Sequence, residues 1–352
     1  MNGLVEVLAG SPGCTVQDAG RFGHRHQGIP LAGWLDRPLA EAANALLGNP
    51  PDAACIELRG PGPALRVLDG PVRVALAGRA GATVQRADAA AQPLPAWTSA
   101  TLQAGDTLRL APVAGGCAYL ALGGGVLVPP VLGSRATYVR AGLGGLHGGP
   151  LRAGDRLPCA RAATPHGRER QAPRPWTGGD GPIRVLPGPQ ADHFDDAALA
   201  AFLDSAWQAT PAQDRMGLRL AGPVLAHRSA AQADIVSDGV APGAVQVPAS
   251  GQPIVLLADG QTVGGYPKIA TVIAADLPRL AQAAPGSWLR FQAVDAAAAH
   301  AALAALRARW ADWAAALQDL APSGLPDEAA LYASNLISGM VHAQAVPDEE
   351  TP

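Results

Sequence analysis

The sequence predicts a mainly β protein made of many short strands. Its 352 residues include 42 glycines and 33 prolines, which together form about a fifth of the chain and favour turns. Short apolar runs alternate with these turns in the first half, and the alternation resumes after a polar stretch in the middle. Hydrophobic residues make up 48% of the chain and charged residues 16%, a balance typical of globular proteins.

Six apolar runs in the first half are expected to be strands, with one helix among them. The runs are Gly3–Leu8, Ile56–Leu58, Ala64–Val67, Val72–Ala77, Thr107–Ala111 and Tyr119–Leu122. The helix is expected at Arg37–Leu47. Asp36 suits its N-cap, Pro38 its first turn and Gly48 its C-terminal end. The uncharged stretch Ala111–Ser134 contains three prolines and six glycines, so it predicts two buried strands and a turn rather than a membrane span.

The chain divides into two predicted modules joined by a linker. The N-terminal module covers residues 1–160, a polar linker rich in Pro and Arg covers 161–182, and the C-terminal module covers 183–352. The second module is expected to begin with a strand at Ile183–Leu186 and to contain helices near Asp195–Trp207 and at Asp295–Leu320.

The predicted helix at Asp295–Leu320 carries an apolar stripe. Its large apolar residues recur at alternating spacings of three and four, at Leu303, Leu306, Trp310, Trp313, Leu317 and Leu320. Such a stripe either packs on its own domain or forms a seam with a partner helix. We expect the first, because it is the more common use of such a stripe.

Composition and motifs argue against several classes of protein. The formal net charge of −3 and an isoelectric point near 6.2 argue against a nucleic-acid-binding surface. Four widely spaced cysteines suit a reducing compartment rather than a disulfide framework or a zinc site. The N-terminus lacks a signal-peptide pattern, so we expect a cytoplasmic protein without a membrane partner. P-loop, nucleophile-elbow and HExxH motifs are missing, so no reaction follows from pattern alone.

Lys268 is the single lysine among the 26 Lys and Arg residues of the chain. It follows a Gly-Gly-Tyr-Pro turn within Gly251–Arg279, which also contains the polar residues Asp259 and Gln261. An ammonium group fits a tight pocket that a guanidinium does not, and glycines let backbone amides approach a ligand closely. The alternative is an ordinary hairpin with one solvated lysine, and the pattern alone leaves both interpretations open.

Four segments together resemble a carboxyltransferase-like family of proteins. The segments are Thr15–Asn49 (beginning TVQDAGRFG), Gly133–Asp155, Gln213–Pro223 and Ile235–Arg279 (with SDGVAPGAVQVP), and the tail Asn335–Ala343 is also similar. The family includes the C subunit of 5-oxoprolinase, the second subunit of allophanate-hydrolase-type proteins, the antagonist of a sporulation-kinase inhibitor and half of the carboxyltransferase region of urea amidolyase. The resemblance covers nearly the whole chain.

The resemblance implies two cyclophilin-like β-barrel modules with flanking helices. It also implies the C subunit of a bacterial ATP-dependent 5-oxoprolinase, which opens 5-oxo-L-proline to L-glutamate with a B subunit of related fold and a separate A subunit. ATP then belongs to the complex, the chain is inactive alone, and no tightly bound cofactor or metal is expected in it. Two alternatives stay open: a non-catalytic regulator that antagonises a B-like histidine-kinase inhibitor, and a carboxyltransferase or allophanate-hydrolase-type subunit of urea metabolism.

The family segments place Arg, Asp, Gln or Asn beside glycines, which suits recognition of a small amide, carboxylate or phosphate. The candidate catalytic residues are Lys268, Arg21, Arg215, Asp18 and Asp36. The cations would offset charge on a phosphorylated lactam oxygen, and the carboxylates would orient them or accept a proton. The candidate substrate-binding residues are Gln17, Asn44, Arg135, Asp214, Asp259, Gln261, Thr262, Gly264, Gly265 and Tyr266. In the alternative interpretation, the arginines pair with nearby aspartates and hold loops in place.

Two positions depart from the family pattern. Gly260 stands where members usually carry the arginine of an Ala-Asp-Arg-Gln motif, and Gly149 and Pro150 stand where many carry an arginine. Each change removes a planar donor group. Contacts to substrate or partner therefore need not match those of other members.

Overall fold

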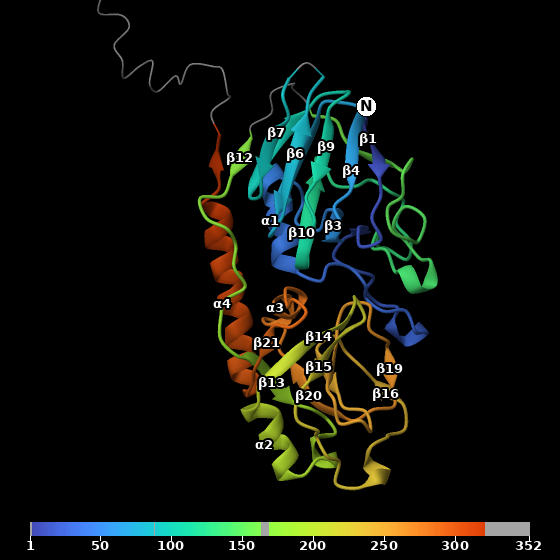
Figure 1. Ribbon diagram of the computed structural model, residues 1–352, viewed down its shortest axis with the longest axis vertical. Coiled ribbons are helices and arrows are strands. Elements are labelled where there is room, and N and C mark those ends of the chain that lie inside the picture. Colours follow the sequence, from blue (N-terminus) through green and yellow to red (C-terminus); the bar gives the residue numbers. More distant parts are fainter. Residues whose placement is uncertain (1, 88, 163–168, 321–352) are drawn as a thin grey trace, which may run out of the picture.

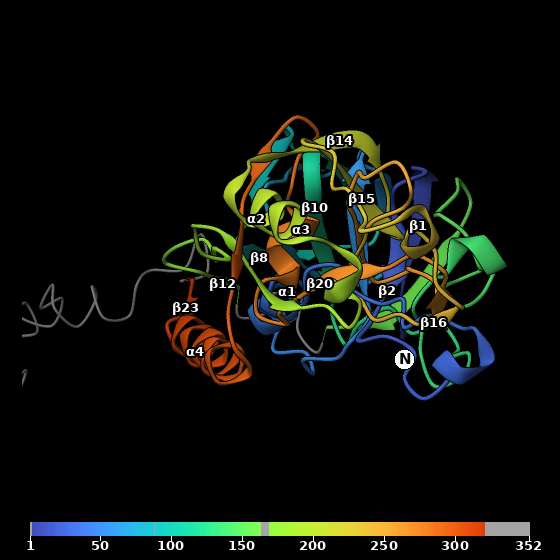
Figure 2. The ribbon, with the colours of Figure 1, turned by 90° about the horizontal axis from the view of Figure 1, so that it is seen from below.

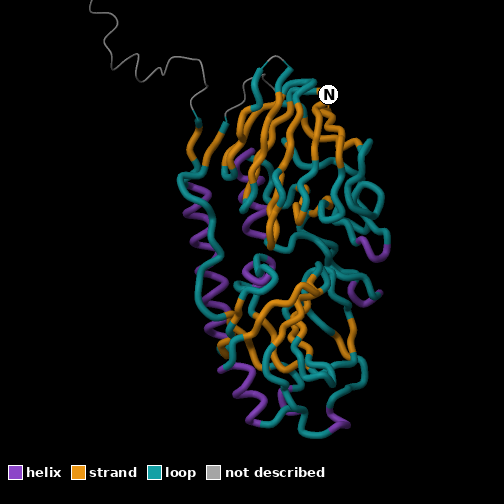
Figure 3. The backbone as a smooth tube through the Cα atoms, viewed as in Figure 1, coloured by secondary structure: helices purple, strands orange, loops and turns teal. Residues whose placement is uncertain are grey.

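The computed structural model describes residues 2–87, 89–162 and 169–320. Figure 1 shows two modules stacked along the long axis, with the strands of the N-terminal half above and those of the C-terminal half below. Helix α4 (Ala296–Ala315) runs along one side of both modules. Strands dominate each module, and loops fill much of the space where the modules meet (Figure 3). The fold is mainly β and includes a nearly closed barrel, as the sequence predicts.

Two antiparallel sheets form the N-terminal module, in the orders β11-β1-β4-β9-β6-β7 and β2-β3-β10-β5-β8-β12-β23. Their strands are β1 (Asn2–Ala9), β2 (Thr15–Gln17), β3 (Cys55–Gly60), β4 (Ala64–Asp69), β5 (Val72–Ala77), β6 (Gly81–Gln85), β7 (Gln92–Pro95), β8 (Thr98–Leu102), β9 (Thr107–Leu110), β10 (Val113–Leu122), β11 (Arg156–Ala160), β12 (Arg170–Gln171) and β23 (Gln318–Asp319). In β1, Val5 and Val7 are buried while the residues between them are partly exposed, as alternation along a half-buried strand requires. The buried faces of both sheets share one core, which includes Ile56, Leu76 and Leu108.

Helix α1 (Arg37–Leu47) lies where the sequence predicts it. Asp36 accepts a hydrogen bond from the Leu39 amide at 3.1 Å, and Gly48 ends the helix with a left-handed backbone at φ 70°. The helix packs against β5 and β10 and buries its apolar side there. Its N-terminus, with Asp36, lies where the first module meets the second.

One eight-stranded sheet, in the order β21-β14-β15-β18-β17-β20-β13-β22, forms most of the C-terminal module. Its strands are β13 (Ile183–Pro187), β14 (Trp207–Gln213), β15 (Gly217–Ala221), β17 (Ala244–Gln246), β18 (Ile254–Leu256), β20 (Lys268–Val272), β21 (Trp288–Leu289) and β22 (Phe291–Ala293). Only β13 and β22 pair in parallel among the described strands. A two-stranded sheet, β16 (Asp238–Gly239) with β19 (Val263–Gly264), is separate from it. The helical elements are α2 (Asp196–Asp204), α3 (Leu277–Ala281), η1 (Arg25–Gln27), η2 (Val139–Ala141), η3 (Ala191–His193) and η4 (Ala230–Gln232).

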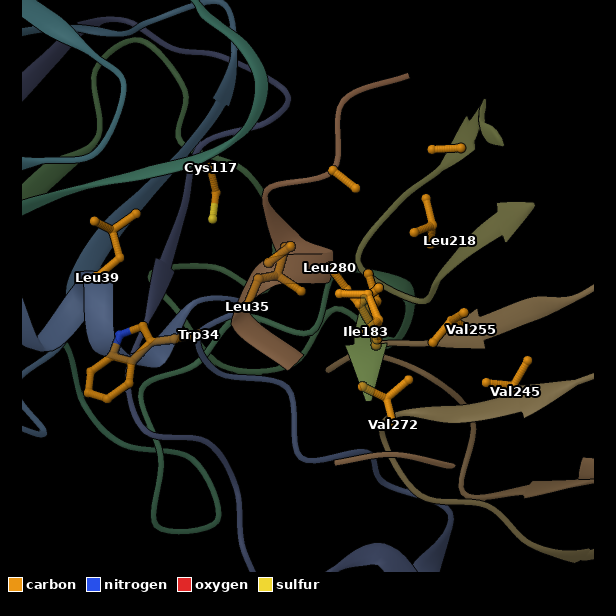
Figure 4. Close-up of a cluster of buried hydrophobic side chains, with 14 of the residues drawn as sticks. Trp34, Leu35, Leu39, Cys117, Ile183, Leu218, Val245, Val255, Val272 and Leu280 are labelled. Carbon is orange, nitrogen blue, oxygen red and sulfur yellow. The ribbon is translucent and has the colours of Figure 1, made fainter. Parts of the chain in front are cut away.

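Buried side chains from both modules form one hydrophobic core across their junction (Figure 4). Leu39 and Cys117 come from the N-terminal module, and Ile183 and Leu280 come from the C-terminal one. Leu35, in the loop before α1, is also part of this core. Burial of a large aliphatic side chain contributes roughly 1.5–3 kcal/mol, so the shared core holds the two modules together.

The apolar stripe of α4 packs within the chain rather than against a partner helix, but its bonds reach the N-terminal module and the inter-module linker instead of staying within its own module. Trp310 donates from Nε1 to the Pro38 carbonyl at 3.2 Å, and Trp313 donates from Nε1 to the Arg174 carbonyl at 2.9 Å. Seen from below, α4 lies at the edge of the molecule (Figure 2). The helix ends at Ala315 rather than at Leu320, because the chain then forms β23, which pairs with β12 in a sheet of the N-terminal module.

Two further expectations were wrong in detail. The residues Ala111–Ser134 form one long strand, β10, and after it only a single bridge between Val131 and Ser134, since prolines cannot donate to a second ladder. Helix α2 is shorter than expected, because Trp207 begins β14. None of the described helices is long and apolar enough to cross a membrane. The family-like tail Asn335–Ala343 lies outside the described residues.

Candidate functional site

Arg215 connects the two modules through a buried network of charged groups. It lies in the turn between β14 and β15, and Asp259 lies just after β18. Arg215 Nε and Nη2 donate to the two carboxylate oxygens of Asp259, each at 3.0 Å. Its Nη1 donates to Glu57 on β3 of the other module, and Nη2 also donates to the Gly33 carbonyl. This bidentate geometry is the strong form of an Arg–carboxylate pair.

The charges in this network shift one another's pKa. Burial by itself lowers the pKa of Arg215, but Asp259 and Glu57 outweigh burial and hold it well above its usual range, so Arg215 stays cationic. Burial raises the pKa of Asp259 more than Arg215 lowers it. Asp259 is nonetheless the anion of the bidentate pair, because both of its oxygens accept from Arg215.

The network continues from Glu57 towards α1. Tyr119 Oη donates to Glu57 Oε2 at 2.6 Å and accepts from the Asp36 amide at 3.1 Å. Asp36 Oδ2 accepts from Nε2 of Gln282, on the C-terminal side of the junction, at 2.9 Å. Burial is the largest influence on Asp36 and raises its pKa to about 7. A continuous chain of polar groups thus runs from Asp259 to Gln282.

Arg21 and Asp18 hold a loop of the N-terminal module beside this network. Arg21 is fully buried and donates to the Val131 carbonyl at 3.0 Å and the Ala136 carbonyl at 2.8 Å. Asp18 accepts from Ser134 Oγ at 2.6 Å and from the Arg135 amide at 2.5 Å. These contacts agree with the interpretation in which the polar residues fix loops.

One nitrogen of Arg21 keeps this arginine among the candidates. Its buried Nη1 has no hydrogen-bond partner in the described part of the chain. Burial lowers the pKa of Arg21, and Asp18 and Asp259 act against that effect. Arg21 is therefore near enough to Asp259 for their charges to interact, and its buried Nη1 keeps an unused hydrogen-bond donor.

Lys268 forms a second polar cluster, apart from Arg21 and Arg215. It is the first residue of β20 rather than part of a turn, and it is only 3% exposed. Its Nζ donates to Asp238 Oδ2 at 2.8 Å, and this bond is the largest of the causes that lower the Asp238 pKa. The solvated-lysine interpretation is therefore wrong. Within the described residues, the partner of Lys268, Asp238, bonds Gln190 and the Gly239 amide as well, and none of these groups belongs to the Arg215 network.

Two glutamines that the sequence analysis did not select complete the Lys268 cluster. Gln190 accepts from the Lys268 amide at 3.2 Å, and Gln246 lies opposite Lys268 in the sheet. Gln246 is 1% exposed; its Oε1 accepts from Gln261 at 3.0 Å, while its Nε2 has no partner among the described residues. The signal that the sequence offered for this cluster is Gln246, a polar residue within the apolar run before Pro248. The cluster offers a lysine and an amide donor to a small polar group.

Several other candidates are engaged in local structure. Asn44 donates to the Ala53 carbonyl at 2.8 Å, and Asp214 accepts from the Met216 amide at 2.8 Å. The side-chain nitrogen of Gln17 donates to Thr15 Oγ1 and to the Thr137 carbonyl, and Arg135 donates from Nε to the Val128 carbonyl. Thr262, Gly264, Gly265 and Tyr266 lie in or beside β19. The predicted binding roles of these residues stay predictions.

An apolar cavity of about 520 Å³ lies beside the Arg215 network. Its wall includes Ala19 and Ala258, the chain neighbours of Asp18 and Asp259, and Leu306 and Trp310 of α4. A cavity of this size suits a small organic molecule. No group of described His, Cys, Asp and Glu residues has the arrangement of a metal site.

Comparison with known proteins identifies the family. Residues 27–293 match the model of the carboxyltransferase domain, subdomain A and B. The chain belongs to this family. The C subunit of Escherichia coli 5-oxoprolinase is 39% identical over 82% of this chain and 90% of that protein.

Solved structures agree with this assignment. The crystal structure of TTHA0988 matches with a TM-score of 0.71 and 35% identity over 82% of this chain, which spans only 56% of that longer chain. The Kluyveromyces lactis urea carboxylase structure matches with a TM-score of 0.78 and 25% identity over 92% of this chain and 30% of that chain.

Proposed function

We propose that this chain is the C subunit of an ATP-dependent 5-oxoprolinase and that the Arg215 network borders its reaction site. The observation that carries the proposal is the 39% identity to the C subunit of a 5-oxoprolinase over nine tenths of that protein. The similarity to urea carboxylase is weaker in sequence, at 25% identity. The proposed complex also contains a related B subunit and a separate A subunit.

The reaction must activate an unreactive carbonyl. Transfer of the γ-phosphoryl group of ATP to the lactam oxygen releases ADP and makes the carbonyl carbon electrophilic. Water adds to that carbon, and the C–N bond opens as its nitrogen takes up a proton, which leaves an acyl phosphate. A second water then releases phosphate and glutamate.

The described residues supply groups for the first of these steps. Arg215, which stays cationic, and the free Nη1 of Arg21 would offset negative charge on the transferring oxygens. Asp259, which holds Arg215 through both of its oxygens, would keep this cation in position for that role. The neighbouring apolar cavity would accommodate the methylene groups of the ring.

The test is a reconstituted complex with the A and B subunits. ADP and glutamate release are measured with and without 5-oxoproline, for the wild type and for Asp259→Asn. We expect the variant to lose ~10²-fold or more in turnover, as when one positioned electrostatic group is removed. Arg219→Ala is the matched control, because Arg219 is exposed on the adjacent strand β15 and should leave turnover unchanged. Full turnover by Asp259→Asn would remove this residue from the mechanism.

A carboxyl-transfer reaction on a urea-type amide is the second candidate. The structural likeness to urea carboxylase over 92% of the chain favours it. The same complex would then consume a urea derivative and leave 5-oxoproline unchanged.

A further inference from the structure

A second cavity, of about 630 Å³, lies between the modules on the side of the inter-module segment 172–182. The N-terminal module contributes Asp36, Arg79 and Trp97 to its wall, and the C-terminal module contributes Gln282. The segment itself closes another side with Trp176 and the residues that follow it, up to residue 180. The cavity is thus separate from the one beside Ala19 and Ala258.

The inter-module segment is tied to the structure, so the cavity is already formed. Arg309 of α4 lies 5.2 Å from the centre of the Trp176 ring and donates to the Thr177 carbonyl at 3.0 Å. Arg279 donates to the carbonyls of Gly181 and Pro182. A preformed cavity binds a ligand without the entropy cost of ordering a loop.

The walls combine aromatic faces with charges of both signs. Arg79 and Asp180 are exposed, and neither has an ion-pair or hydrogen-bond partner within the described residues. Asp36 is 5% exposed, and it contributes a carboxyl group to the wall. Arginine binds carboxylates through two parallel hydrogen bonds, and a carboxylate accepts from an ammonium group.

Trp97 is held in an unusual backbone conformation at this place. Its φ of 69° in the turn between β7 and β8 is rare for a bulky residue and strains the backbone there. The ring also makes an edge contact with Trp313, with centroids 5.9 Å apart. This packing keeps Trp97 at the cavity wall, where it can stack on a planar group.

We propose that this cavity is a second ligand site, for a zwitterion that carries an aromatic ring, such as an aromatic amino acid. Arg79 binds its carboxylate, Asp180 accepts from its ammonium group, and Trp97 packs on its ring. This assignment uses the two exposed charged groups of the wall that have no ion pair in the described structure. It does not depend on the proposed function, because Arg79, Asp180 and Trp97 do not belong to the Arg215 network.

The test is isothermal titration of the full chain with three probes: L-phenylalanine, phenylpropionate, which lacks the ammonium group, and phenethylamine, which lacks the carboxylate. We expect L-phenylalanine to bind at least ~10-fold more tightly than either analogue. Arg79→Ala should lower the affinity for L-phenylalanine to that of the wild type for phenethylamine. Asp180→Asn should lower it towards the affinity of the wild type for phenylpropionate.

The matched control is Arg307→Ala, which removes an exposed arginine from the wall of the other cavity. It should leave L-phenylalanine binding unchanged. The proposal would be overturned if the three probes bound equally or if L-phenylalanine did not bind. It would also be overturned if Arg307→Ala, and not Arg79→Ala, reduced the binding of L-phenylalanine. Circular dichroism of each variant confirms that the comparison is made on folded protein.

Discussion

Asp36 should make the stability of the fold fall as the pH rises towards neutrality. Its folded pKa of about 7 lies above its ordinary value of 3.8, and burial is the main cause. Between these two values the unfolded chain has released the proton of Asp36 while the folded chain still holds it. Stability contributed by the protonated carboxyl is therefore complete below about pH 4 and is lost progressively up to about pH 7.

The size of this loss follows from the two pKa values. Each pH unit is worth about 1.4 kcal/mol, so the interval from 3.8 to about 7 corresponds to roughly 4 kcal/mol as an upper bound. Asp36→Asn removes the titrating proton and keeps a side chain that caps helices as well as aspartate does. The groups that face Asp36 are Glu57 on β3, Cys117 and Tyr119 on β10 and Gln282 after α3, and all stay unchanged in the variant.

Urea unfolding of the wild type and Asp36→Asn at pH 5 and pH 8 tests this reasoning. We expect the variant to gain stability relative to the wild type between the two pH values, by about 2–3 kcal/mol, because only the two units from pH 5 to about 7 fall within the interval. Taking the difference between the unfolding free energies of the two proteins cancels the contribution of every titrating group that they share. An unchanged difference between pH 5 and pH 8 would show that Asp36 is ionised normally in the folded chain.

Three other predictions concern the polar clusters and the complex. Asp238→Asn should destabilise the fold more than Lys268→Met in urea unfolding, because it leaves the buried Lys268 ammonium without its anion. In Lys268→Met the unpaired group is Asp238, which is half-exposed and can be hydrated. The reverse order of stabilities would contradict this reasoning. The purified chain should show no ATPase activity stimulated by 5-oxoproline, since its sequence has no P-loop, and substantial activity would refute the assignment as a dependent subunit. Asp259→Asn should still co-purify with the B-like partner while losing turnover; loss of association in a folded variant would instead favour the regulator hypothesis.

The sequence predicts an element correctly where the residues that determine it are close together in the chain. Helix α1 was predicted at its observed bounds because Asp36, Pro38 and Gly48 act within one turn of its ends. The mainly β class likewise followed from short apolar runs and the turns between them. The last helix was predicted too long, because the pairing of β23 with β12 depends on a segment far away in the chain.

The candidate site was harder to predict, because its contacts are non-local. Arg215 and Asp259 were selected, but Glu57 and Tyr119 were missed, since both lie inside buried strands where a single polar residue attracts little notice. Lys268 was selected correctly as unusual, yet its partner Asp238 lies 30 positions earlier and on another strand. Arg21 was selected with a catalytic role in view, and the structure adds a loop-holding role for two of its nitrogens.

The position of Arg215 makes the candidate site depend on how the modules sit together. Its two carboxylate partners come from different modules, Glu57 from one and Asp259 from the other. A shift of one module would leave this buried cation with one partner, and breaking a buried ion pair costs about 3–5 kcal/mol. Tyr119 bonds both Glu57 and the Asp36 amide, and Asp36 in turn bonds Gln282 across the junction. A partner protein that moves the modules therefore changes the bonds of Arg215 without touching the site itself.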